Sequence, residues 1–213
     1  MQYSKNISAT NRQTAEAYVL NTMTTSDSSP SKVIAIDLDG TLILTDSLHE
    51  SILQLVRQNI LKIFWLPIWL LKGKAVFKAK IAEIVDLNIT LLPYNLPLIE
   101  WLKQQRAIQK KVILTTAADQ KIAHSIAAHI GLFDEVLASN GTTNNAGARK
   151  RDLLIKRFGA NGWDYAGNSS DDLLVWKAAN CAIVVNASNA LVEQAKQTNN
   201  VTHVFPSIKV NLS

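Results

Sequence analysis

The stretch Lys32-Val33-Ile34-Ala35-Ile36-Asp37-Leu38-Asp39-Gly40-Thr41-Leu42 decides the fold class expected of this chain. It begins with a short β-branched run, typical of a buried parallel strand, and continues with two acids and a glycine, which indicate a loop. Asp37 and Asp39 stand two residues apart, so their side chains are expected to project to the same side of the chain. An Asp-Gly pair alone is common in turns, but the whole string is far more specific. We therefore predict a buried strand with two carboxylates at its carboxyl end.

Strands and helices alternate along the rest of the chain. Short runs predict further strands at residues 111–115, 135–137, 164–166, 182–185 and 202–205. Helical spacing predicts helices at residues 96–109, 120–130, 147–158, 171–179 and 189–197. Gly131 is suited to end the second of these helices. The alternation implies βαβ crossovers and a mainly parallel sheet, in which ligands bind beyond the carboxyl ends of the strands.

Residues 46–86 are expected to form helices that Pro67 and Gly73 break into two or three pieces. Residues 59–82 contain no acid and five lysines, namely Lys62, Lys72, Lys74, Lys78 and Lys80. Such a cluster favours a specific surface for nucleic acid, an anionic membrane or a phosphorylated ligand, although a solvated helix face is the simpler interpretation of any single lysine. Nucleic acid is disfavoured because the lysines are interleaved with long aliphatic side chains and form no reading motif.

The apolar run Ile63–Leu71 in the same segment carries Phe64, Trp65 and Trp69. An ordinary helical core is the favoured interpretation, and a surface that rests on a membrane or grips a lipid tail is the alternative. A bilayer span needs roughly 20 apolar residues, so no transmembrane helix is expected from this run.

Length and composition suit one domain with a smaller insert. The chain has 213 residues, of which 47% are apolar and 18% charged, and its formal net charge is +5. The single cysteine, Cys181, excludes an internal disulfide and is expected to be a buried thiol, which fits a reducing cytoplasm. Residues 1–31 are polar and carry no secretory pattern, so a disordered tail is expected there, with a short helix at 14–20.

The carboxylate pair at the first strand end suits phosphoryl chemistry. One acid can attack phosphorus and form an aspartyl-phosphate, and the other can protonate the leaving oxygen and then activate water. The pair also attracts a hard cation such as Mg²⁺, which takes oxygen ligands and bridges to a substrate phosphate.

Asp37-Leu38-Asp39-Gly40-Thr41-Leu42 resembles the first motif of the haloacid dehalogenase (HAD) superfamily of hydrolases. The resemblance implies an α/β fold with a Rossmann-like, mainly parallel sheet and a small α-helical cap inserted after the first strand. It implies Asp37 as nucleophile and Asp39 as general acid and base, with Gly40 and Thr41 beside the substrate phosphate. It also implies a core of residues 32–46 and 91–213, a cap insert at 47–90 and the tail at 1–31.

Two further superfamily motifs have counterparts after the first strand. Thr116 matches the phosphate-binding hydroxyl and is followed by Ala117, while Asp119 is suited to cap the next helix. Lys150, which stands between two arginines, matches the lysine that neutralises charge between nucleophile and phosphate. A surface lysine on a helix is the alternative interpretation.

The string Gly167-Asn168-Ser169-Ser170-Asp171-Asp172 resembles the superfamily's final acidic loop. Asn168 replaces the first acid, which ligates the metal, and Asp172 matches the second, with Asp171 as a substitute. The metal site implied for Mg²⁺ therefore comprises Asp37, Asp39, Asn168 and Asp172. Because an amide oxygen is neutral, Mg²⁺ is expected to bind more weakly than to a carboxylate.

Other stretches are similar to the HAD-like domain found N-terminal to UbiA-type prenyltransferases in many bacteria: residues 48–51, 66–73, 92–95, 128–139 and 171–176. The resemblance covers about residues 32–206. It implies a Mg²⁺-dependent phosphatase that acts on a small phosphomonoester through an aspartyl-phosphate. By association it implies a polyprenyl-linked or other lipid-linked substrate, a cytoplasmic location at the inner face of the membrane, and a UbiA-type membrane prenyltransferase as partner. The alternative, which Asn168 supports, is a weak or inactive module that regulates such a prenyltransferase.

Overall fold

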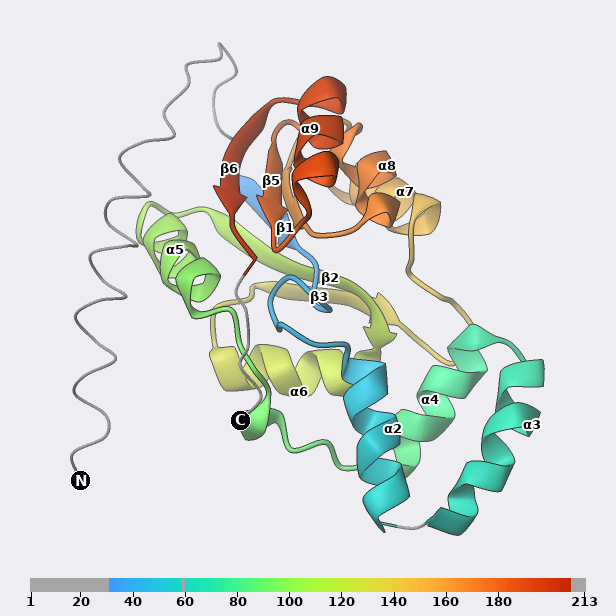
Figure 1. Cartoon of the computed structure of the whole chain (residues 1–213). Helices are drawn as coiled ribbons and strands as arrows, with labels where there is room; N and C mark the ends of the chain where they lie inside the picture. Colours follow the sequence, from blue (N-terminus) through green and yellow to red (C-terminus); the bar gives the residue numbers. More distant parts are fainter. Residues whose placement is uncertain (1–30, 59, 208–213) are drawn as a thin grey trace, which may run out of the picture.

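The computed structural model describes residues 31–58 and 60–207, and within them six parallel strands form one sheet. The strand order is β3-β2-β1-β4-β5-β6, with β1 near the centre (Figure 1). The strands are β1 (Val33–Ile36), β2 (Lys111–Asp119), β3 (Glu135–Ser139), β4 (Asp164–Gly167), β5 (Ala182–Val185) and β6 (Val201–Phe205). The expected α/β class is thereby confirmed. The expected tail at 1–31 and short helix at 14–20 lie outside the described residues, apart from Ser31.

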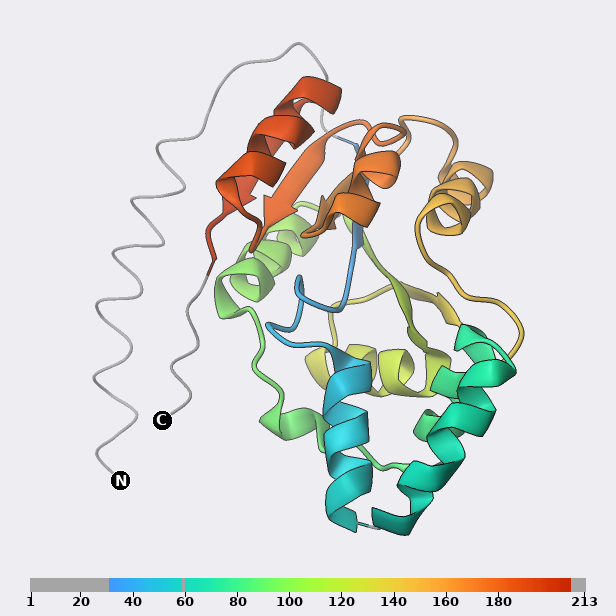
Figure 2. The same cartoon turned by 45° about the vertical axis from the view of Figure 1, so that its right-hand side comes forward.

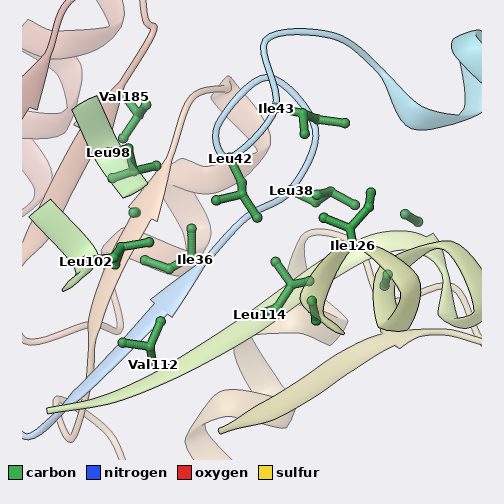
Figure 3. Packing of buried hydrophobic residues seen from close by; sticks show 14 of the residues in the cluster. Ile36, Leu38, Leu42, Ile43, Leu98, Leu102, Val112, Leu114, Ile126 and Val185 are labelled. Atoms are coloured by element: carbon green, nitrogen blue, oxygen red, sulfur yellow. The ribbon is translucent and has the colours of Figure 1, made fainter. Parts of the chain in front are cut away.

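Alternate positions of the strands face two different cores, because successive side chains of a strand point to opposite faces. One face carries Ile34 and Ile36 and is covered by α5 (Leu96–Ala107) and α6 (Gln120–Ile130). In Figure 3, Leu98 and Leu102 of α5 and Ile126 of α6 surround side chains of β1 and β2. All five of these residues are buried to within 1% of full burial.

The opposite face carries Ala35 and Tyr165 and is covered by three helices. These are α7 (Ala148–Phe158), α8 (Leu173–Trp176) and α9 (Asn189–Thr198), which lie together on one side of the sheet in Figure 1. Trp163 and Trp176 are fully buried in this core. Cys181 is also buried, with 3% of its surface exposed, as expected from the sequence. Helices on both faces make the sheet inaccessible except at its edges and strand ends.

Most element boundaries follow the sequence pattern. Helix α6 covers the expected residues, begins after Asp119, whose side chain accepts from Lys121 N, and ends at Gly131 with φ of 69°. The largest differences are in two elements. Strand β2 continues past Thr115 to Asp119, and the helix expected at 171–179 is reduced to a 3₁₀ turn (η3, Ser170–Asp172) followed by the short α8. The 3₁₀ turn forms because the Asp172 side chain folds back to accept the backbone N–H groups of its own loop.

Residues 47–58 and 60–84 form a helical insert that leaves the sheet after β1. It comprises α2 (Ser47–Gln58), η1 (Ile60–Trp65), α3 (Leu66–Leu71) and α4 (Lys74–Ile84), and a later 3₁₀ turn, η2 (Ile89–Leu91), follows it. The insert packs around its own cluster of Leu55, Ile81 and Val85, separate from the two sheet cores. Figure 2 shows its helices standing beside α6, and α4 contacts both α6 and β2. Among the described residues, no helix is both long and apolar enough to cross a membrane.

Candidate active site

The register of the sheet brings three loops to the same edge. Ile36, the last residue of β1, pairs with Leu114 of β2 and Ala166 of β4. Asp37 follows directly, and its N–H donates to the carbonyl of Ala166 at 2.9 Å. The residues after these positions on β2 and β4 include Thr116 and Asn168. The expected meeting of the first, second and last motifs at the carboxyl edge thus follows from strand pairing.

A buried charge network of four residues, Asp37, Lys150, Tyr165 and Asp172, lies at this edge. Lys150 Nζ donates to Asp37 Oδ1 at 2.8 Å and to the Tyr165 hydroxyl at 2.9 Å. The Tyr165 hydroxyl donates to Asp172 Oδ1 at 2.7 Å, and Lys150 Nζ lies 3.8 Å from the same oxygen. One cation therefore holds the two carboxylates, with the phenol bridging between lysine and Asp172.

Lys150 is the only one of three consecutive basic residues to reach Asp37 in the structure. It lies in the first turn of α7 and is 4% exposed. Arg149 is exposed, and Arg151 pairs with its neighbour Asp152 at 2.7 Å. A surface position for Lys150, the alternative left open by the sequence, is wrong.

Burial dominates the electrostatics of the network. Burial raises the pKa of Asp37 to about 7, against the lowering effect of Lys150, and Asp172 and Asp39 raise it further. Burial alone would lower the pKa of Lys150, but the charges of Asp37 and Asp172 outweigh it and the pKa is raised. Burial, followed by the charge of Asp172, holds the pKa of Tyr165 well above its usual value, so that the phenol remains a neutral donor. The cluster carries excess negative charge.

Asp172 is held firmly by its own loop. Its Oδ2 accepts from the N–H groups of Asn168 and Ser169 and from the Ser169 hydroxyl, each at 3.0 Å. A Cβ on Gly167 would come within 2.7 Å of the Asp172 carboxyl, so glycine is needed there for the close approach. Asp171, the substitute considered from the sequence, is exposed.

Asn168 lies against the first motif. Its Oδ1 accepts from the Thr41 hydroxyl at 3.2 Å, and a Cβ on Gly40 would come within 2.1 Å of its Nδ2. Gly40 also has φ of 73°, and its carbonyl accepts from Asn186 Nδ2 at 3.1 Å. Gly40 is therefore required both by the backbone conformation and by the proximity of the last motif.

Asp39 lies beside the first residue of the helical insert. Its Oδ1 accepts from Ser47 N at 2.7 Å, at the start of α2, and burial raises the pKa of its carboxyl. A small cavity beside it is lined by Asp39, Asp46, Ser47, Leu48, Lys78, Ala118, Asp119 and Ile122. An acid with a raised pKa next to a cavity is suited to exchange a proton with a ligand there.

Thr116 and Ala117 lie within β2. The Thr116 side chain is buried and its Oγ1 accepts from Ala118 N at 2.9 Å, which leaves the hydroxyl proton available for donation. The carbonyl of Ala117 accepts from Ser139 Oγ at 2.9 Å and from Lys78 Nζ at 2.6 Å. The second motif is thereby tied to the insert.

The sequence pattern alone does not assign Tyr165 or Lys78 to the site. The position of Tyr165, two residues before Gly167, was the available signal, but its contact with Lys150 depends on how α7 packs on β4. In the sequence Lys78 is one of five similar lysines, yet its half-buried side chain enters the site from α4, and burial lowers its pKa. A helical phase that pointed it toward Asp39 could not be fixed without knowing where α4 begins.

The oxygen donors present suit a hard cation that retains several waters. Within residues 31–58 and 60–207 there is no group of three or more His, Cys, Asp or Glu arranged to hold a metal ion. The carboxylate of Asp37 and the amide oxygen of Asn168 nevertheless flank the same strand ends, and the excess negative charge of the network would be relieved by a divalent ion. In proteins Mg²⁺ is usually bound by few protein ligands and keeps several waters.

Comparison with solved structures identifies the fold. No family model matches the chain. A HAD-family hydrolase of Salmonella enterica serovar Typhi aligns with a TM-score of 0.60 and 14% identity, over 84% of this chain and 68% of that one. A phospho-aspartyl intermediate analogue of phosphoserine phosphatase aligns with a TM-score of 0.56 and 16% identity, over 83% and 94% of the two chains. This chain has the HAD fold.

Two other similar proteins have no described function. A Bordetella pertussis protein of unknown function aligns with a TM-score of 0.61 and 15% identity, over 84% of this chain and all of that one. In sequence, the uncharacterized protein y4nM of Sinorhizobium fredii is 37% identical over 152 residues, which are 70% of this chain. The match spans only 29% of the length of y4nM.

Proposed function

We propose that this chain is a phosphatase of the HAD superfamily that hydrolyses a small phosphomonoester through an aspartyl-phosphate on Asp37. The observation that carries the proposal is the 2.8 Å contact between Lys150 Nζ and Asp37 Oδ1 in a buried network at the carboxyl edge of a HAD-type sheet. A buried carboxylate held by one lysine, at the strand edge where such sheets bind ligands, has the position of a nucleophile.

The proposed reaction uses Asp37 and Asp39 in turn. A carboxylate oxygen of Asp37 attacks phosphorus, and the bond from phosphorus to the leaving oxygen breaks as Asp39 donates its proton to that oxygen. Asp39 then takes a proton from water, whose oxygen attacks phosphorus and releases phosphate and the Asp37 carboxylate. The raised pKa of Asp39 supports its part as the acid of the first step.

Phosphate binding is assigned to the loops that meet at Asp37. The Thr116 hydroxyl and the Lys150 ammonium would hold phosphate oxygens, with the backbone beside Gly40, Thr41 and Ala117 completing the site. Lys150 would then bridge nucleophile and phosphate, and Tyr165 and Asp172 would keep it oriented. Tyr165 and Asp172 act as positioning residues in this scheme, since both lie within 4 Å of Lys150 Nζ and neither is assigned to the phosphate.

Mg²⁺ is the proposed cofactor. Asp37, Asp39 and Asn168 would hold it, and a bound ion would neutralise charge on the phosphate. Direct binding of the ion by Asp172 stays a prediction from the sequence. The hydrogen bonds on both Asp172 oxygens favour indirect support through Lys150.

Hydrolysis of para-nitrophenyl phosphate by the full chain, with and without Mg²⁺, tests the proposal. Asp37→Asn should abolish turnover and leave the unfolding temperature close to that of the wild type, while Asp171→Asn, at an exposed acid outside the buried network, should retain activity. Full activity in Asp37→Asn would refute the mechanism.

The substrate class we propose is a lipid-linked phosphate, handled at the cytoplasmic face of a membrane beside a UbiA-type prenyltransferase. The exposed apolar side chains of the insert that delivers Lys78 to the site support this choice. Comparing hydrolysis of a short-chain prenyl phosphate with that of a water-soluble sugar phosphate tests it. Equal kcat/KM for the two substrates would contradict the proposed preference for a lipid-linked phosphate.

The neutral amide of Asn168 favours a second function, that of a weak or inactive module regulating such a prenyltransferase. An amide oxygen attracts Mg²⁺ less than a carboxylate does, so the wild type should need more Mg²⁺ than Asn168→Asp for half-maximal activity. If neither protein turns over substrate at saturating Mg²⁺, the regulatory function is favoured.

A further inference from the structure

Large apolar side chains are exposed together at one end of the helical insert. Phe64 is 76% exposed, Trp65 55% and Leu71 89%. We call the whole set the apolar tip: Ile60, Leu61, Phe64, Trp65, Ile68, Leu70 and Leu71, all in η1 and α3. Other exposed large apolar residues, such as Leu96 and Ile108 at the two ends of α5, lie on separate elements. Seven exposed apolar residues within twelve positions indicate an interaction surface.

The apolar tip is distinct from the side chains that fold the insert. Leu66, Trp69 and Phe77 turn inward and pack against the cluster of Leu55, Ile81 and Val85. The core interpretation favoured from the sequence therefore holds for Trp69, whereas Phe64 and Trp65 face outward. Since the insert has its own core without them, folding alone does not account for their apolar character.

The charges beside the tip are positive. Residues 60–82 contain five lysines and no acid. Lys78 is engaged at the candidate active site and Lys80 pairs with Glu83 at 2.7 Å. Lys62 lies within η1, and the exposed Lys72 and Lys74 follow α3 directly. Apolar and aromatic side chains fringed by lysines complement an anionic bilayer, in which rings enter the interface and ammonium groups reach lipid headgroups.

We propose that the apolar tip docks on a membrane that contains anionic phospholipid, with Phe64, Trp65 and Leu71 in the interfacial layer and Lys62, Lys72 and Lys74 at the headgroups. A lipid surface is favoured over a protein partner because protein interfaces are depleted in lysine. The tip lies on the insert, far from α5 and α9 in Figures 1 and 2, so docking leaves the sheet clear of the membrane. This proposal does not depend on catalysis.

The arrangement would hold the candidate active site close to the membrane. Lys74 and Lys78 stand four residues apart on α4, which corresponds to about 6 Å along the helix axis. Lys74 is one of the lysines beside the apolar tip, and Lys78 donates to the carbonyl of Ala117, which follows Thr116. A phosphate carried on a membrane lipid would therefore have a short route to the site.

Vesicle flotation of the full chain tests the proposal. The wild type should float with vesicles of phosphatidylcholine and phosphatidylglycerol and much less with pure phosphatidylcholine. Phe64→Ser/Trp65→Ser should weaken binding about tenfold or more, because two apolar side chains no longer enter the interface. Lys72→Ser/Lys74→Ser should weaken binding to the anionic vesicles about tenfold. The matched control, Leu96→Ser/Ile108→Ser, removes two similarly exposed apolar side chains at the two ends of α5 and should bind as the wild type does.

Fluorescence quenching locates the contact. Of the other four tryptophans, Trp101, Trp163 and Trp176 are at most 6% exposed and Trp69 packs against the core of the insert, so lipids brominated in their acyl chains should quench mainly Trp65. Trp65→Phe should still float and should lose most of that quenching. The proposal is overturned if the wild type fails to bind anionic vesicles, if the control loses as much binding as Phe64→Ser/Trp65→Ser, or if the tip instead drives self-association without lipid in light scattering.

Discussion

The buried charge network and the apolar tip differ in how the chain builds them. Lys150 is 4% exposed and contacts an acid 113 positions away in the sequence, whereas Phe64 is 76% exposed and its partners in the tip lie within a few residues of it. The network places charges where water is scarce and satisfies them with one another. The tip places apolar groups where water is abundant and leaves them there. Both arrangements cost free energy in the isolated fold, and such costs concentrate where a protein binds or reacts.

The strongest test of this comparison is Lys150→Met, which removes the cation of the network. Asp37 and Asp172 would remain buried without it, so the free energy of unfolding should fall by about 3–5 kcal/mol and phosphatase activity should be lost. Lys156→Met makes the same substitution at an exposed position of α7 and should cost under about 1 kcal/mol. Urea unfolding of both variants measures the difference. If Lys150→Met lowered the free energy of unfolding no more than Lys156→Met does, water would have access to the network.

Gly40→Ala and Gly131→Ala separate backbone strain from crowding at the site. Both glycines have a positive φ, 73° and 69°, so alanine should cost about 1–2 kcal/mol at each. Only at Gly40 would the new Cβ meet Asn168, at 2.1 Å, and this clash should add about 1–3 kcal/mol. Chemical unfolding should show the excess, and activity should fall only in Gly40→Ala. Equal costs would indicate that Asn168 moves away freely.

Tyr165→Phe tests whether the phenol positions Lys150. The variant leaves Asp172 Oδ1 without its 2.7 Å donor, so the free energy of unfolding should fall by about 2 kcal/mol. kcat should fall more than KM rises if Lys150 is misplaced. Tyr94→Phe removes a hydroxyl that donates to the carbonyl of Ile89 at 2.8 Å, outside the network, and should change stability by about 1 kcal/mol with unchanged kcat. A purely structural role for Tyr165 predicts lost stability with normal kcat.

The sequence predicts which acids lie at the carboxyl edge of the sheet, because the alternation of side chains along a strand is a local property. Val33–Ile36 alternate between the two cores, and the acids that follow must emerge at the carboxyl end of β1. Lys150 could be proposed from its motif, yet nothing local distinguished it from its arginine neighbours. The distinction comes from the burial of the third position of α7 against β4, which is a tertiary effect.

Tyr165 and the tip show where local reasoning stops. The hydroxyl of Tyr165 meets Lys150 and Asp172 only because α7 and η3 both pack over β4, and no spacing in the sequence encodes that meeting. Trp65 and Trp69 lie four residues apart, a separation that would place them on one face of a regular α-helix. They face opposite ways because the chain changes from η1 to α3 between them.

Asp164 is a buried acid outside the network, and it tests whether a buried carboxylate also destabilises the fold there. It lies at the amino end of β4, 3.6 Å from Lys110, and burial raises its pKa above 3.8. A raised pKa means that the folded chain holds the proton more tightly, so this stabilising contribution is complete below pH 3.8 and is lost as pH rises through the folded pKa. Asp164→Asn should flatten the decline of unfolding free energy over that window. Parallel curves for variant and wild type would show that water reaches this carboxylate.

The smallest effect is expected at the apolar tip itself. Phe64→Ser/Trp65→Ser exchanges side chains that already face water, so the free energy of unfolding should change by no more than about 0.5 kcal/mol per site. Trp69→Ala, in contrast, removes a ring from the core of the insert and should cost about 2 kcal/mol. Thermal unfolding of the two variants gives the contrast directly. If serine at both exposed positions destabilised the insert as much as the loss of Trp69, the tip would be part of the fold, and its apolar side chains would need no membrane to explain them.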